Sequence, residues 1–377
     1  MPMRLVFVVL MTIHGLIHLI GVVKAFGIAD VPQLTRPISP AFGVVWLLAA
    51  LLTLAAMVAL FVAPAWWWLI GAVALVVSQV AIVSSFADAK FGTLANVILL
   101  LGVIYGFATQ GPTSFRADLA RHASAGLARV AALPSPGLIS EDDLAPLPPP
   151  VQRYLRVTGF VGQPRILSYR VTFSGRIRSD ASAAWMPFEA EQQSFADEPT
   201  RLFLMSATMS GVPVQAFHRF VGAAATMDVK VAGLIDMVHA SGEVMNRSET
   251  VTLFNDMCIL APGTLISPAI RWEAVDDHTA NARFTLGEQT IAAVLHFDDD
   301  GQLIDFVSDD RSRAAPDGKS FASMRFSTPV RDYRAYGPFR LAAHGDARWH
   351  APAPEGEFVY GEFETLSVAY NNEDASR

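Results

Sequence analysis

Long apolar runs that lack charged residues dominate the first 110 positions of the chain. Between Arg36 and Asp88, 51 consecutive residues carry no charge. One membrane-crossing helix needs about 20 apolar residues, so this run is long enough for two. Pro64 and the tryptophans at 66–68 mark the turn between them, because indole rings favour the membrane interface. With the apolar runs on either side, the pattern predicts four transmembrane helices, at residues 5–23, 41–62, 66–87 and 94–108.

The first of these predicted helices carries two histidines. His14 and His18 are four residues apart and therefore share one helix face. Ionisable groups inside a membrane are costly, so one hypothesis is a metal or haem ligand pair. Residues 24–110 contain no further histidine, so a haem held between two helices would need a second subunit. The alternative, which we favour, is that both imidazoles hydrogen-bond to neighbouring helices, with Gly15 and Gly21 allowing close approach.

An even number of crossings places both chain ends on the same side of the membrane. The basic residues near these ends and in the loops give only a weak bias toward the cytoplasm. Residues 115–133 have apolar positions at helical spacing, typical either of a helix lying on an anionic leaflet or of a connecting helix. A cleavable signal peptide competes for residues 5–23, but no small-residue cleavage site follows them. We predict a multi-pass protein of the cell inner membrane with its C-terminal domain in the cytoplasm.

The pattern changes to a period of two after residue 165. Tyr169, Val171 and Phe173 alternate with polar neighbours, and similar runs separated by short turns continue to the C-terminus. The pair Asp300-Gly301 between two such runs predicts a hairpin. Short connections favour antiparallel pairing. Residues 249–258 differ, because their apolar positions follow helical spacing after a capping Ser248.

These patterns predict three parts. Residues 1–110 form an α-helical transmembrane domain, and residues 111–149 form an amphipathic helix followed by a proline-rich linker. Residues 150–377 form an α+β soluble domain, in which a large curved antiparallel sheet is covered by helices.

Charge and cysteine content narrow the function. Residues 1–110 hold four basic and two acidic residues, which leaves 24 basic and 33 acidic residues, a net charge of −9, in the rest. So acidic a domain argues against nucleic acid as a partner, since phosphate binding needs a basic surface. The single Cys258 excludes an intramolecular disulfide, and its place on the apolar stripe of the predicted helix indicates a buried small residue. No known metal, nucleotide or nucleophile motif occurs, so we predict no cofactor and no metal.

Polar residues gather midway along the predicted soluble domain. Glu249 and Asp256 are seven residues apart and lie two turns along one helix face. Opposite His218 or Lys230 from the sheet, they could serve as catalytic groups in proton transfer. The alternative, which we favour, is an ion-pair network at a junction between helix and sheet.

Methionines and phenylalanines concentrate between residues 205 and 245. Such side chains either line a cavity that adapts to varied apolar ligands or simply pack a core. The residues predicted to bind a ligand of this kind are Met205, Phe217, Arg219, Met227, Lys230 and Phe254.

Several short motifs together resemble a known family. They occur in the order LPPPVQRYLR, FHRF, ATMDVK, RSETVTLFNDM, RWEAVDD, SDDR, FSTPVRDY and GEFVYGEFETLSVAYN, within residues 146–372. This series is similar to a bacterial family of unknown function, here preceded by a four-helix membrane region. The order of elements also resembles the half-barrel of periplasmic lipoprotein carriers, a likeness of architecture alone.

These observations favour a membrane-anchored protein whose soluble domain binds an apolar ligand such as a lipid. Its expected partners are membrane lipids and a second copy of the chain, paired through the transmembrane helices, with no nucleic acid. One alternative is an enzyme that uses Glu249, Asp256 and His218. Another is a non-catalytic subunit or sensor of a membrane complex.

Overall fold

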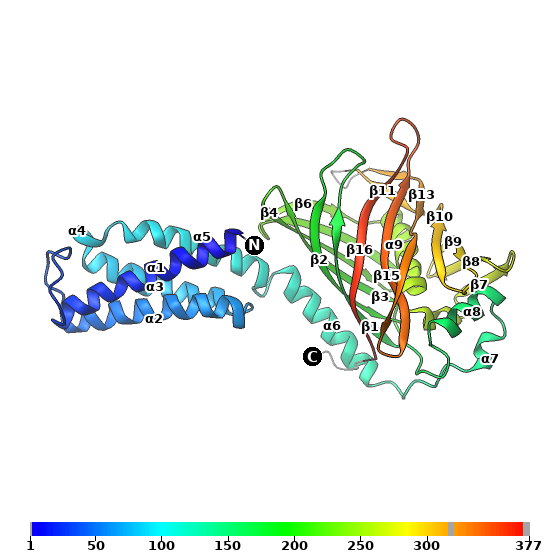
Figure 1. The fold of residues 1–377 in the computed structure, drawn as a ribbon, viewed down its shortest axis with the longest axis horizontal. Helices are drawn as coiled ribbons and strands as arrows, with labels where there is room; N and C mark the ends of the chain where they lie inside the picture. The colour runs from blue at the N-terminus through cyan, green and yellow to red at the C-terminus, as the bar shows by residue number, and fades with distance from the viewer. Residues whose placement is uncertain (1, 316–319, 372–377) are drawn as a thin grey trace. The chain divides into compact units, whose positions relative to one another are not determined.

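The computed structural model describes residues 2–315 and 320–371. The chain divides into two compact units, Met1–Asp118 and Leu119–Arg377. The first unit is a bundle of helices and the second is a curved sheet with a helix inside its curve (Figure 1). The change from long apolar runs to alternating runs in the sequence therefore corresponds to a change from helices to strands.

Four long helices make up the first unit. They are α1 (Pro2–Ala25), α2 (Pro40–Val62), α3 (Trp67–Ser84) and α5 (Gly92–Gln110), and the short α4 (Phe86–Ala89) follows α3. Each predicted helix is confirmed, with ends that differ from the prediction by at most three residues. The third ends early because the backbone leaves the helical conformation at Ser85. All four regions are long and apolar enough to cross a membrane, as judged by length and composition.

The helical bundle buries small residues and exposes large apolar ones. The exposed side chains include those of Leu5, Val62 and Leu94. At Gly21, an added Cβ would lie 2.2 Å from the Trp46 ring, so only glycine permits this approach of α1 and α2. Small residues at helix contacts and apolar side chains on the outside are typical of helices that pack within lipid. Five alanines are fully buried between the helices: Ala49, Ala50, Ala56, Ala74 and Ala81.

The helix α6 (Phe115–Ala131) contains the boundary between the two units. It confirms the helix predicted at residues 115–133. Its C-terminal part packs on the sheet domain, where Gly126 lies against the ring of Phe195 and Arg129 pairs with Asp197 at 2.6 Å. These contacts support the connecting-helix interpretation for this part of α6.

Much of the predicted proline-rich linker is folded against the sheet domain. A capping box formed by Ser140 and Asp143 begins α7 (Glu141–Leu144), and α8 (Pro149–Val157) follows. Ile139 and Leu144 are fully buried in the core of the domain. Two apolar residues in a polar and proline-rich segment were too weak a pattern to indicate this packing.

Fourteen strands of the described residues form one large sheet, and all their pairings are antiparallel. The order is β6-β5-β4-β3-β2-β1-β16-β15-β13-β10-β9-β8-β7, and β14 pairs with β15. Two further strands, β11 and β12, pair with each other. The predicted large antiparallel sheet is therefore confirmed, and Figure 1 shows it curving around α9.

The strands have the following bounds: β1 Ser168–Ile177, β2 Met186–Phe195, β3 Thr200–Met209, β4 Val212–Val221, β5 Ala224–Val231, β6 Ile235–Ala240, β7 Ile270–Ala274, β8 Thr279–Leu286, β9 Gln289–Phe297, β10 Leu303–Ser308, β11 Ser312–Ala314, β12 Phe321–Ser323, β13 Arg325–Ser327, β14 Val330–Tyr336, β15 Phe339–His350 and β16 Glu357–Tyr370.

The turn between β9 and β10 confirms the predicted hairpin, because Gly301 adopts a φ of 78° there. That left-handed conformation suits glycine, which has no Cβ.

The central helix α9 (Glu243–Leu260) lies inside the curve of the sheet (Figure 1). The predicted start at residue 249 is wrong, since the helix begins six residues earlier, after Gly242. Ser248 is therefore not a cap but lies within the helix, where its Oγ accepts a hydrogen bond from the Ser312 amide at 3.0 Å. The predicted apolar stripe is confirmed, with three fully buried side chains: Val251, Phe254 and Cys258. A short 3-10 helix (Pro262–Ile266) follows α9.

Candidate functional site

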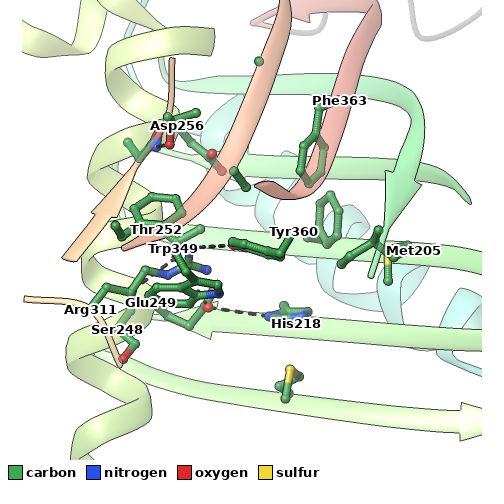
Figure 2. Close-up of a pocket in the computed structure, with 18 of the residues that line it drawn as sticks. Met205, His218, Ser248, Glu249, Thr252, Asp256, Arg311, Trp349, Tyr360 and Phe363 are labelled. Carbon is green, nitrogen blue, oxygen red and sulfur yellow. Dashed lines mark hydrogen bonds and ion pairs between the residues drawn. The ribbon is translucent and has the colours of Figure 1, made fainter. Parts of the chain in front are cut away.

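A cavity of ≈ 450 Å³ lies between α9 and the inner face of the curved sheet. Its walls are mostly apolar, and aromatic and methionine side chains from strands far apart in the sequence contribute to them. Figure 2 shows Met205 of β3 and Tyr360 and Phe363 of β16 on one side, with α9 on the other. A volume of this size is within the range of pockets that hold small molecules.

One side of the cavity carries a buried ion-pair network. The side chain of Arg201, on β3, is only 8% exposed. Its Nε donates to Asp256 Oδ2 at 2.6 Å, and its terminal nitrogen lies 3.4 Å from Glu249 Oε2. One arginine therefore bridges two carboxylates that are two turns apart on α9. Burial alone would lower the pKa of Arg201, but these two carboxylates raise it.

His218 extends this network from the neighbouring strand β4. Its Nδ1 lies 3.6 Å from Glu249 Oε1, as Figure 2 shows. Burial would raise the pKa of Glu249, but His218, Arg201 and Arg311 together lower it to about 2. Glu249 is therefore held ionised by the charges around it.

Arg311 occupies an aromatic cage at the same end of the network. Its guanidinium carbon lies 4.1 Å from the centre of the Phe326 ring and 5.2 Å from that of Trp349. The same guanidinium donates to the Tyr360 hydroxyl at 2.8 Å (Figure 2). Aromatic faces stabilise a cation at such distances, so the charge remains beside an apolar wall.

The structure brings five of the predicted site residues together on the cavity. These are the three catalytic candidates and two of the ligand-binding candidates, namely His218, Glu249, Asp256, Met205 and Met227. The catalytic candidates are joined by the ion-pair network that was the favoured alternative.

The other four ligand-binding candidates are not among the residues that line this cavity. Phe217 and Arg219 lie on the opposite face of β4 from His218, because side chains alternate along a strand. Arg219 pairs there with Asp228 at 3.0 Å. On β5, Lys230 lies 3.5 Å from Asp236, and on α9 the Phe254 ring stacks on Phe284 at 5.2 Å, away from the cavity.

Arg201 is the main site residue that the sequence reasoning missed. Its signal was present, because Arg201, Phe203 and Met205 are alternate residues of one strand and thus share a face. A charged residue in line with two apolar ones indicates a buried partner. Trp349 and Tyr360 carried no comparable signal, because only the pairing of β15 with β16 brings them together.

The two histidines of α1 are hydrogen-bonded to neighbouring helices, as the favoured alternative expected. His14 Nε2 lies 3.2 Å from Ser78 Oγ and 3.0 Å from Asn96 Oδ1, and His18 Nε2 lies 2.8 Å from the same Ser78 oxygen. Both histidines are buried. Across residues 2–315 and 320–371, no three histidine, cysteine, aspartate or glutamate side chains are grouped so that they could hold a metal ion.

Cys258 is fully buried, as predicted for a residue on the apolar stripe. Burial raises the pKa of its thiol well above the usual value. A thiol of this kind is unreactive, since the thiolate is the nucleophilic form. Cys258 therefore contributes packing rather than chemistry.

Comparison with known proteins gives distant likenesses in structure. The chain is similar to a protein described as an outer membrane lipoprotein-sorting protein domain from Vibrio parahaemolyticus, with 10% identity and a TM-score of 0.33, over 55% of this chain and 87% of that one. It is also similar to a DUF1329 family protein from Desulfovibrio piger, with 12% identity and a TM-score of 0.34, over 56% and 88% of the two chains. A third likeness is to a beta-barrel-like DUF1849 protein from Brucella abortus, with 9% identity and a TM-score of 0.19, over 55% and 98%. Likenesses this low support no conclusion about function.

At the level of sequence, no curated protein matches the chain. A family match does exist, and it spans residues 137–363, which is more than half of the chain. The match begins at the segment before α7 that packs against the sheet domain. It includes every element that lines the cavity except the last residues of β16. The chain therefore belongs to the family of unknown function DUF6544.

Proposed function

We propose that the protein is anchored in the cell inner membrane by its four long helices and binds an apolar ligand, such as a lipid, in the cavity of its sheet domain. The observation that carries this proposal is the cavity itself, whose ≈ 450 Å³ are walled mainly by apolar side chains. Methionines such as Met205 and Met227 adapt to ligands of varied shape because their side chains are flexible.

The electrostatics of the cavity favour binding over acid–base catalysis. A general base works best when its pKa is near the working pH. The pKa of Glu249 is lowered to about 2 by His218, Arg201 and Arg311, which outweigh the effect of burial. A carboxylate with so low a pKa is a weak base and a negligible acid near neutral pH, which makes the catalytic alternative the weaker one.

The composition of the helical unit supports a membrane anchor. Its four long helices carry few charges, and their outward side chains are large and apolar. A domain tethered to such helices would remain close to the lipids of the bilayer, which are the most abundant apolar ligands there. Pairing of two chains through these helices stays a prediction.

Photo-crosslinking tests the ligand-binding proposal. The full chain in detergent micelles is exposed to a C16 alcohol that carries a mid-chain diazirine, and labelled peptides are identified by mass spectrometry. We expect adducts on peptides that contain Met205, Met227 or Tyr360, because these residues line the cavity. Labels on the membrane helices are distinguished from these by their position in the sequence.

A matched pair of tryptophan variants controls the experiment. Val238→Trp places an indole in the cavity wall, whereas Val221→Trp places one at an exposed position of the same sheet. We expect Val238→Trp to reduce cavity labelling at least about fivefold and Val221→Trp to leave it unchanged. Labelling confined to the helices, or equal in both variants, would contradict the proposal and favour the complex-subunit alternative.

Reporter fusions test the topology. Four crossings place both chain ends on one side, and we propose the cytoplasm. A fluorescent reporter that matures in the cytoplasm, fused after Arg377, should then be active, while alkaline phosphatase at the same point should not. Fusion after Val31, between α1 and α2, should give the opposite result. Alkaline phosphatase activity at Arg377 would show that the orientation is reversed.

A further inference from the structure

Two neighbouring hairpin turns of the sheet domain expose large apolar side chains. They are the turn between β3 and β4 and the turn between β5 and β6, and the Ala232 amide of one donates to the Pro213 carbonyl of the other at 2.8 Å. Apolar side chains that gather at a surface often mark a contact site, whereas single ones are ordinary. Five side chains at these two turns are between 42% and 59% exposed, and together we call them the apolar tip: Met209, Val212, Leu234, Ile235 and Met237.

Both turns are tight, which keeps these side chains at the surface. Ser210 and Gly211 have φ values of 49° and 84°, and Ala232 and Gly233 have values of 53° and 70°. Residues in this left-handed conformation reverse the chain within two or three positions. Neither turn is therefore long enough to fold back and cover its own apolar side chains. Residues 209–214 and 231–235 also carry no charge.

The apolar tip continues the wall of the cavity. On β3, Phe203 and Met205 line the cavity, and Ala207 and Met209 follow on the same face, because side chains alternate along a strand. Across the turn, Met209 pairs with Val212 of β4. Four residues of a strand span about 13 Å, which is the length of the path from Met205 to Met209. An unbroken apolar face therefore leads from the cavity to the apolar tip.

A charged pair beside the apolar tip lies on the other face of the sheet. Lys230 Nζ is 3.5 Å from Asp236 Oδ1, and the Asp236 side chain is 78% exposed. Lys230 alternates along β5 with Val229 and Val231, which share the inner face with the cavity residue Met227. The two charges can therefore remain in water while the inner face of the tip contacts an apolar partner.

Area and tethering favour a bilayer over a second protein as that partner. Five side chains that are about half exposed present only a few hundred Å², less than the roughly 800 Å² per partner of a stable protein interface. A bilayer requires no complementary shape, and a tether makes a weak contact sufficient because it raises the effective concentration to roughly the millimolar range. Only residues 111–114 separate α5 from α6, and the 17 residues of α6 span about 25 Å.

We propose that the apolar tip inserts into the bilayer that holds the four long helices, and that the apolar ligand passes between bilayer and cavity along the inner face of β3 and β4. Aliphatic side chains make this contact, so it requires no anionic lipid. The inference goes beyond the proposed function, because it assigns a second surface and a route for the ligand. It rests on the membrane anchor of the proposed function.

Quenching by lipids tests the insertion of the apolar tip. Val212→Cys provides an accessible thiol for a nitrobenzoxadiazole label, while the native Cys258 is buried and is not labelled. Val221→Cys is the matched control, because Val221 is at the other end of β4 and is similarly exposed, at 36% against 42%. The full chain is reconstituted in phosphatidylcholine liposomes. Lipids brominated in their acyl chains should quench the label at residue 212 about twofold and leave the label at residue 221 unchanged.

A charged variant tests the route of the ligand. Leu234→Glu combined with Ile235→Glu places two carboxylates in the apolar tip at exposed positions, where substitutions disturb folding little. When the photoactivatable alcohol is supplied in liposomes, this tip variant should show about fivefold less cavity labelling, because carboxylates resist transfer into lipid. In detergent micelles, which reach the domain from every side, its labelling should be unchanged. Val221→Glu combined with Ala224→Glu is the control of equal charge, at the turn between β4 and β5, and should change neither result.

The outcomes separate this inference from the proposed function. Equal quenching at residues 212 and 221, or unchanged cavity labelling from liposomes in the tip variant, would overturn the inference. Crosslinking of two copies through a thiol at residue 212, without quenching by lipid, would overturn it in favour of a second copy as the partner. Failure of the parent protein to be labelled in micelles would instead overturn the proposed ligand binding, and quenching at residue 212 would still decide whether the tip inserts.

Discussion

Each unit of the protein buries a histidine-containing polar cluster, and the two clusters differ in charge. In the helical unit, His14 and His18 hydrogen-bond to Ser78 and Asn96, and these hydrogen bonds include no carboxylate, lysine or arginine. In the sheet domain, His218 contacts Glu249 within a network that also contains Arg201. One cluster is joined by hydrogen bonds between polar groups, whereas the other depends on ion pairs.

The surroundings of each cluster explain this difference. If the helices face lipid, as we propose, full charges between them are very costly, and hydrogen bonds among hydroxyl, amide and imidazole groups satisfy the polar atoms. In the sheet domain, a charged pair is tolerated because further partners satisfy it: Arg201 binds two carboxylates, and Asp256 also accepts from Gln192. Removal of one side chain should therefore lower the free energy of unfolding far more in the cluster of the sheet domain than in that of the helical unit.

The largest effect should follow from removal of the bridging cation. Arg201→Met keeps the length of the side chain but leaves two buried carboxylates without their shared partner, which should destabilise the sheet domain by about 3–5 kcal/mol. Denaturant unfolding can be followed by maleimide labelling of Cys258, the single cysteine, which is buried in this domain. Arg219→Met is the control, because the pair of Arg219 with Asp228 is on the opposite face and more exposed, and should cost about 1 kcal/mol or less. Equal effects would contradict a special role for Arg201.

A smaller effect should appear in the pH dependence of stability. The pKa of Glu249 is about 2 in the folded state, below its usual value of 4.5. Between these values the unfolded chain binds more protons, so this contribution is complete above about pH 4.5 and is lost as the pH falls toward 2. The ionisation of Glu249 therefore contributes roughly 3 kcal/mol to the free energy of unfolding. Glu249→Gln should lower the free energy of unfolding at pH 6 by about this amount and remove this part of the acid dependence, measured by circular dichroism during denaturant unfolding. Parallel curves for the variant and the parent protein down to pH 2 would show that Glu249 is not held ionised.

The smallest effect should come from the helical cluster. Ser78→Ala removes an oxygen that His14, His18 and Asn96 all contact, and should cost roughly 1 kcal/mol, as hydrogen bonds between membrane helices contribute modestly. Unfolding of the helical unit in mixed detergent micelles measures this cost. Ser84→Ala is the control, because its hydroxyl donates to the Ala81 carbonyl in the same helix. A loss of more than about 3 kcal/mol would mean that the helical cluster is as interdependent as the charged one.

Local periodicity predicted most of the fold. The apolar runs located four helices, and the alternation that begins near Tyr169 predicted antiparallel strands. These features depend on the side chains of neighbouring residues, which the sequence states directly. For the central helix, the apolar stripe was predicted correctly but the first residue was not. The helix begins after Gly242 and not after Ser248.

The sequence alone determined the four long apolar helices, the change to alternating strands, and that polar residues cluster near the middle of the sheet domain. Only the tertiary structure decided which of these side chains meet. Phe217 and His218 are adjacent in the chain but lie on opposite faces of β4, and the face that lines a cavity depends on how the whole sheet curves around α9. Arg201 reaches Glu249 and Asp256 across a separation of 48 and 55 residues. Such contacts arise from the order of strands in the sheet, which no local pattern specifies.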